Sequence, residues 1–279
     1  MTPEQKHIID EFVSFGRMDG HYWSAWEGQN TIEKMQNAEN AMGDALIAEV
    51  RARTKTVRTP RLPSPHELVD LTRGRVEPMV RGLFPRAEQD HVLGLLEKSV
   101  VFVSPKNVEQ LIREQSFGHS AWTVANLFLL YVGAELLSDE APRIVGFSEA
   151  TTCFVSPEYL SCRGAFEDFI VHEAAHVFHN WKREYAGLPH TRRREWLLEI
   201  DFRKRETFAY SCEVYSRILE QGRTPKERTA LLEQYREKPF GPAHVEVGVD
   251  EHLDILNEAV SARNGWKRIL ARCAPARRP

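Results

Sequence analysis

Apolar residues recur at helical spacing in the first part of the chain. Residues 3–15 and 30–52 place apolar side chains three and four positions apart, which predicts two amphipathic helices. The aromatic segment His21–Trp26 connects them. We therefore expect an N-terminal helical hairpin.

A basic stretch with several prolines follows at residues 51–65, and it cannot be helical throughout. Its composition is typical of a linker, so we place a domain boundary there. Short helices are predicted next, at residues 65–73, 75–83 and 86–98. Ser64, with Glu67 three residues later, gives the first of them a capping-box start.

The period of the pattern changes in the middle of the chain. Short β-branched or aromatic runs bounded by Pro or Gly predict strands at residues 99–104, 143–147 and 151–156. The turn at residues 148–150 predicts a hairpin between the last two. Residues 121–137 form the longest apolar stretch, but it is too short and too polar to span a bilayer, so we expect a buried core helix.

Helical spacing returns in the last part of the chain and ends at Gly and Pro residues. The predicted helices cover residues 164–186, 195–221, 225–237 and 250–263. The order of helices, a small sheet and more helices favours an α+β fold. We expect an N-terminal helical region at residues 1–98, which could dock substrate or regulate, and a second domain at residues 99–279.

Composition narrows the class of protein. The 279 residues are 42% hydrophobic and 28% charged, with a formal net charge of −3, which is typical of a soluble globular protein without a global attraction to nucleic acid or lipid. The four cysteines show no CxxC pair, and the start of the chain lacks a signal-peptide pattern. These features predict a cytoplasmic protein with passive thiols; they leave its oligomeric state open.

One short segment carries the chemistry of a metal site. His172, Glu173 and His176 form the pattern H-E-x-x-H inside a predicted helix with apolar flanks. Two imidazoles four residues apart lie on one helix face and can bind one Zn²⁺, while the Glu acts as general base toward a water that the metal acidifies. A buried His/Glu hydrogen-bond network without metal is the alternative.

With this motif the chain resembles the zincin metallopeptidases, and the resemblance covers about residues 140–220. His179 and Lys182 stand where the metzincin branch requires Gly and His, so the gluzincin branch fits better. That branch takes a Glu on a later helix as third ligand, and the segment Arg205–Glu213 is similar to such a helix and loosely similar to the ImmA/IrrE-type regulatory peptidases. The resemblance implies a zincin-like fold, a small sheet packed on the active-site helix, and an extended substrate that pairs with residues 151–156.

Glu206 is our candidate for the third ligand. Glu199, Glu206, Glu213 and Glu220 recur every seven residues, as on a solvated helix face, but Glu206 lacks the cation four residues on that Glu199 and Glu213 have. Glu213 is the main alternative, and Glu199, Asp201 and His179 stay open.

Tyr210 and His190 are candidate donors to a developing oxyanion. The sequence thus predicts a Zn²⁺-dependent metallopeptidase acting on a protein or peptide, with Glu173 and Tyr210 as catalytic groups.

Two alternatives remain: a zincin-like binding or regulatory protein without turnover, and a nucleic-acid-associated protein with a structural metal. The second would use the basic segments 51–61 and 192–205.

Overall fold

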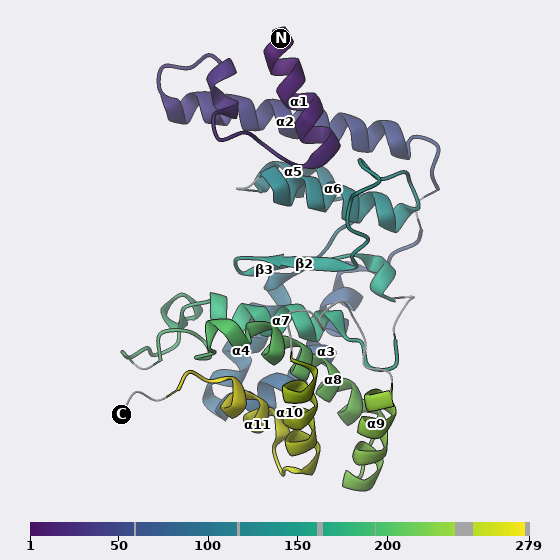
Figure 1. Ribbon diagram of the computed structural model, residues 1–279, viewed down its shortest axis with the longest axis vertical. Helices are drawn as coiled ribbons and strands as arrows, with labels where there is room; N and C mark the ends of the chain where they lie inside the picture. Colours follow the sequence, from purple (N-terminus) through teal and green to yellow (C-terminus); the bar gives the residue numbers. More distant parts are fainter. Residues whose placement is uncertain (59, 116–117, 161–163, 193, 238–247, 277–279) are drawn as a thin grey trace. The chain divides into compact units, whose positions relative to one another are not determined.

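The computed structural model describes residues 1–58, 60–115, 118–160, 164–192, 194–237 and 248–276. Within them the chain is mostly helical, with a small three-stranded sheet, so the α+β class is confirmed (Figure 1). The chain divides into two compact units. Unit 1 comprises residues 1–62, 102–146 and 154–158, and unit 2 comprises residues 63–101, 147–153 and 159–279.

This division differs from the boundary expected between residues 98 and 99. Residues 63–101 belong to the unit that also contains the H-E-x-x-H segment, and the first cut falls between Leu62 and Pro63, within the Pro-containing stretch 51–65. The role expected for residues 1–98 stays a prediction.

Unit 1 is helical, and most of its elements follow the apolar pattern. It contains α1 (Pro3–Phe15), α2 (Thr31–Thr54), α5 (Val108–Glu114) and α6 (Gly118–Val132). The two N-terminal helices and the buried helix within residues 121–137 are confirmed, whereas α5 was not predicted. α2 packs against α1, α5 and α6 (Figure 1). Phe12, Met42 and Leu46 are buried in this core.

Unit 2 contains the remaining helices. They are α3 (Pro65–Leu83), α4 (Arg86–Ser99), α7 (Phe169–Asn180), α8 (Arg205–Gln221), α9 (Pro225–Glu237), α10 (Val249–Ser261) and α11 (Gly265–Cys273). α7 packs against α8, α3 and α4, and α8 in turn packs against α10 and α11 (Figure 1). α7 therefore lies in the core of this unit, and α11, which was not predicted, helps to cover α8.

The prediction of two separate helices at residues 65–73 and 75–83 is wrong. Residues 65–83 form one helix rather than two, even though Pro78 removes one backbone donor in its interior. The buried apolar face of this helix, which includes Val76, Met79 and Val80, runs on both sides of the proline, so packing outweighs the lost hydrogen bond. Ser64 and Glu67 form the expected capping box.

The helices expected at residues 164–186 and 195–221 are shorter than predicted. α7 starts only at Phe169, and α8 starts only at Arg205. Residues 195–204 do not join α8 because the Glu199 carboxylate accepts the backbone N–H groups of Glu195 and Trp196, at 2.8 and 3.1 Å. Such side-chain acceptors compete with helical hydrogen bonding.

The sheet comprises β1 (Val100–Phe102), β2 (Gly146–Glu149) and β3 (Thr152–Val155), and its order is β1-β3-β2. The expected hairpin exists, but its first strand extends to Glu149 and its turn includes Ala150, with φ 51°.

Because β3 is the central strand, its backbone hydrogen bonds go to the two neighbouring strands. The expectation that an extended substrate pairs with residues 151–156 is therefore wrong.

Candidate metal centre

The centre is built on α7, whose burial follows from its sequence. Apolar residues surround the helix on nearly all sides, so the three polar residues of the motif lie inside the unit. His172, Glu173 and His176 are only 6%, 6% and 8% exposed. Asp168 caps the helix, because its side chain accepts the backbone N–H of Val171. Burial of these polar groups requires partners for them.

Glu206, in the first turn of α8, approaches both imidazoles. The two Nε2 atoms of His172 and His176 lie 3.2 Å apart. Oε1 of Glu206 is 3.5 Å from Nε2 of His176, and Oε2 is 3.8 Å from Nε2 of His172. One donor atom from each of these three residues thus falls within 4.8 Å of the other two.

These distances suit ligands of one ion better than direct hydrogen bonds. Both contacts of Glu206 are longer than the usual N–H···O range of about 2.7–3.2 Å. Two donors that each lie about 2.05 Å from a tetrahedral Zn²⁺ are separated by about 3.3 Å. Two neutral imidazoles and one carboxylate are also a typical donor set for a catalytic zinc site. The residues present therefore fit Zn²⁺.

The charges at this site keep Glu206 available as an anionic ligand. Its contact with His176 lowers the pKa of the Glu206 carboxyl, although partial burial opposes this effect. The Glu206 side chain is 40% exposed, whereas the two imidazoles are almost fully covered. The site is consequently open to solvent on the side of Glu206.

Glu173 has a carboxylate oxygen without a partner. Its Oε2 atom is buried and makes no hydrogen bond among the described residues. A buried, unsatisfied carboxylate oxygen is costly, and it is an expected feature of a general base that waits for a proton donor. Glu173 lies between His172 and His176 in the sequence, so its carboxyl is on the same helix as both candidate ligands.

Glu213 holds His172 from the opposite ring nitrogen. Oε2 of Glu213 lies 3.1 Å from Nδ1 of His172, and Oε1 accepts the backbone N–H of Asp168 at 2.8 Å. Burial alone would lower the pKa of His172, but the hydrogen bond and charge of Glu213 raise it overall. This contact leaves Nε2 of His172 as the atom for a metal.

Asp168, whose backbone N–H binds Glu213, makes further contacts that hold Glu213 and His172 in place. Asp168 accepts the hydroxyl of Tyr159 at 2.6 Å and lies 3.4 Å from the Arg75 guanidinium. Burial raises the pKa of Asp168, and Tyr159 and Arg75 partly compensate for it. Residues from α3, the segment before α7, and α8 thus converge behind His172. Sequence reasoning missed these positions; only Asp168, a capping residue directly before an apolar helix, carried a signal.

The solvated-stripe interpretation of the four glutamates fails at Glu213, which is 4% exposed. The cation expected to pair with it, Arg217, contacts Glu220 instead. The other ligand alternatives lie elsewhere: Glu199 accepts backbone N–H groups, and Asp201 accepts that of Arg203. Neither belongs to the described group of His172, His176 and Glu206.

Tyr210 and His179 both border the candidate ligands. The Tyr210 ring lies 4.3 Å from that of His172, and the His179 ring lies 5.3 Å from that of His176, in both cases edge to face. Nδ1 of His179 is buried without a hydrogen bond among the described residues. His190, the other expected oxyanion donor, is an exposed residue, and its Nδ1 atom lies 3.9 Å from the Glu184 carboxylate.

Several basic residues around this region already have acidic partners. Lys182 pairs with Glu195, Arg183 and Arg194 with Glu88, and Lys204 with Glu251. Arg193 and Thr59, in the two basic segments considered for nucleic acid, lie outside the described residues, as does Cys162. The described cysteines, Cys153, Cys212 and Cys273, are buried.

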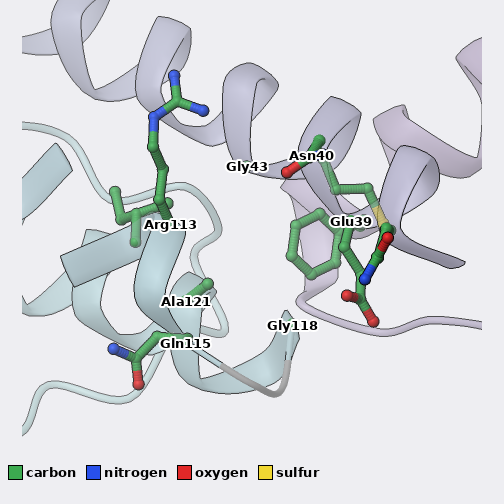
Figure 2. Close-up of a pocket in the computed structure, with 11 residues that line it drawn as sticks. Glu39, Asn40, Gly43, Arg113, Gln115, Gly118 and Ala121 are labelled. Carbon is green, nitrogen blue, oxygen red and sulfur yellow. The ribbon is translucent and has the colours of Figure 1, made fainter. Parts of the chain in front are cut away.

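A separate cavity of ≈ 310 Å³ lies in unit 1 (Figure 2). Phe12, Met42 and Ile112 contribute apolar wall, and Glu39 and Arg113 add charge. Figure 2 shows its labelled residues coming from α2, from the end of α5 with the residue after it, and from the start of α6. None of the three candidate metal ligands lines it.

Of the described helices, none is long and apolar enough to cross a membrane.

Comparison with known proteins adds no relative: the chain matches no family model, no curated protein and no solved structure.

Proposed function

We propose that the protein is a zinc-dependent peptidase of the gluzincin type. The observation that carries this proposal is the convergence of His172, His176 and Glu206, with ligand atoms 3.2, 3.5 and 3.8 Å apart. His172, His176 and Glu206 would hold the ion, and Glu213 would orient His172. When bound in such a site, Zn²⁺ polarises a carbonyl oxygen and makes a water acidic.

Glu173 performs the proton transfers in this proposal. Its carboxylate takes a proton from the water whose oxygen attacks the peptide carbonyl carbon. The C–N bond then breaks, and the same carboxyl gives the proton to the leaving amine. The unpartnered, buried Oε2 atom supports this role, because no neighbouring donor in the described chain competes for it.

Tyr210 is the proposed donor to the oxyanion. It follows Glu206 by one turn of α8, and its ring packs against His172. A phenol O–H near the reacting carbonyl stabilises the negative charge that develops on its oxygen. Replacement of Tyr210 by Phe should therefore lower kcat by about a hundredfold and leave zinc binding unchanged.

Digestion of a mixed peptide library, followed by mass spectrometry, tests the proposal. Zinc-loaded wild-type protein should release new termini, and Glu173→Gln should reduce the rate by about a thousandfold or more with its zinc content unchanged. Glu184→Gln, an exposed glutamate between α7 and α8, serves as the matched control and should keep full activity.

Two outcomes would contradict the proposal. The first is wild-type protein that contains zinc but cleaves no peptide in the library. The second is cleavage that persists in the Glu173→Gln variant, since another group would then be acting as the base.

A further inference from the structure

Arg205 stands directly before the proposed ligand Glu206, at the first residue of α8. A cation at this end of a helix opposes the helix dipole. The next basic residue, Lys204, is occupied: its Nζ atom pairs with Glu251 at 2.8 Å and also donates to the carbonyl of Arg272. Arg205, by contrast, pairs with no acidic side chain among the residues that the structure describes.

The Arg205 guanidinium is held in position but makes no ion pair within the described ranges. Its central carbon lies 3.8 Å from the centroid of the Phe202 ring, and Nε donates to the Phe202 carbonyl at 3.3 Å. Stacking on an aromatic face fixes the plane of a guanidinium. Both Nη atoms stay without a hydrogen-bond acceptor among these residues. They can therefore donate to the two oxygens of a planar anion.

Arg205 is also the direct neighbour of a proposed ligand. Arg205 and Glu206 are consecutive residues in the first turn of α8, so their Cα atoms lie about 3.8 Å apart. The Glu206 side chain is 40% exposed, and Arg205 is itself partly exposed. The Arg205 side chain therefore starts beside the side of the centre that is open to solvent.

We propose that Arg205 binds a carboxylate of the substrate beside the scissile bond, so that the enzyme selects acidic peptides. This inference rests on the proposed peptidase function, whose substrate class it names. Arginine suits the role because its planar fork matches a carboxylate with two parallel hydrogen bonds. The exposed Phe202 ring would support the guanidinium from the other side.

The carboxylate could belong to an Asp or Glu side chain or to the free C-terminus of a peptide. Two arms of one peptide experiment separate these sources. Peptide pairs that differ only by Glu against Gln at the residues flanking the cleaved bond test the side chain. Pairs that end in a free acid or an amide test the terminus. The source is identified by the set of peptides in which the acid has a higher kcat/KM than its uncharged counterpart.

A binding measurement tests the inference without turnover. Dicarboxylic monohydroxamates, from malonic to adipic, anchor on zinc through the hydroxamate and present a carboxylate at increasing distance; the corresponding amides lack that charge. For zinc-loaded protein, calorimetry should show that at least one acid binds about tenfold or more tightly than its amide. Arg205→Gln should remove this preference, and Arg205→Lys should keep part of it.

Arg203→Gln is the matched control. Arg203 is exposed, lies two residues away, and makes no ion pair in the described part of the chain. This variant should keep the preference for the acid. Equal binding of every acid and its amide by wild type, or an unchanged preference in Arg205→Gln, would overturn the inference with the zinc site intact. If no hydroxamate binds, the zinc site itself is wrong, and the inference falls with it.

Discussion

At the scale of single residues, His172 has partners on both ring nitrogens. Nδ1 faces Glu213 at 3.1 Å, and Nε2 faces His176 and Glu206. A carboxylate on Nδ1 fixes the tautomer and makes Nε2 a better ligand. The two glutamates on α8 thus have different roles: Glu206 is a candidate ligand, and Glu213 orients one.

Replacement of Glu213 by Gln tests this division of roles. We expect zinc affinity to fall about ten- to a hundredfold, because Nε2 of His172 becomes a weaker and less well-oriented ligand. Competition with a chromogenic chelator measures the affinity. Glu233→Gln, an exposed site on α9, is the control and should bind zinc like wild type. An unchanged affinity in Glu213→Gln would show that the contact does not tune His172.

The buried cysteines give a prediction about reactivity. Burial raises the pKa of Cys153 and Cys212 well above the ordinary value, and it raises that of Cys273 to about 12. The thiolate is the reactive form, so these three thiols should stay inert at neutral pH. A disulfide reagent should therefore modify at most one of the four cysteines in the native protein, and all four after denaturation. Rapid modification of native Cys162→Ser protein would contradict this.

Sequence alone could single out Glu206 because it lacks a cation four residues later. The same rule misjudged Glu213, since an arginine at that spacing made a buried residue look solvated. Spacing along one helix cannot reveal that α7 packs against this face of α8. Arg75 was out of reach for the same reason: 93 positions separate it from its partner Asp168.

At the scale of elements, side-chain caps account for the correct starts of α1 and α3. α1 and α3 begin at a Thr or Ser cap with Pro and Gln or Glu in the first turn, and both starts were predicted. α8 begins at Arg205, and its N-cap residue Lys204 makes no side-chain cap hydrogen bond, so the pattern carried no start signal and the prediction began ten residues too early. The packing of the segment before it, held by Glu199, is a tertiary feature.

The cap of α7 should matter more than an exposed cap. Asp168→Ala removes the cap and the carboxylate that accepts the buried Tyr159 hydroxyl, and it leaves Arg75 with Glu220 as its remaining carboxylate partner. We expect the free energy of unfolding to fall by about 2–3 kcal/mol, against about 1 kcal/mol for Ser64→Ala at the exposed start of α3. Urea denaturation measures both. A loss in Asp168→Ala no larger than in Ser64→Ala would contradict the network.

At the scale of the whole molecule, all the proposed ligands and catalytic groups lie in unit 2, as do Glu213, Asp168 and Arg75. The α+β class and most of the helices and strands could be predicted from periodicity, although α5 and α11 could not. The position of β3 at the centre of the sheet could not, because chain order does not determine strand order. The assignment of residues 63–101 to the unit of the site also depends on long-range packing.

The central claim is that His172, His176 and Glu206 together bind one zinc ion. Elemental mass spectrometry of untagged protein, purified without chelators, tests it most directly. We predict about one zinc per chain in wild type and in Glu173→Gln, and loss of the metal in both His176→Ala and Glu206→Ala. Wild-type protein without zinc, also after incubation with the ion, would contradict the account, as would zinc retained in both ligand variants.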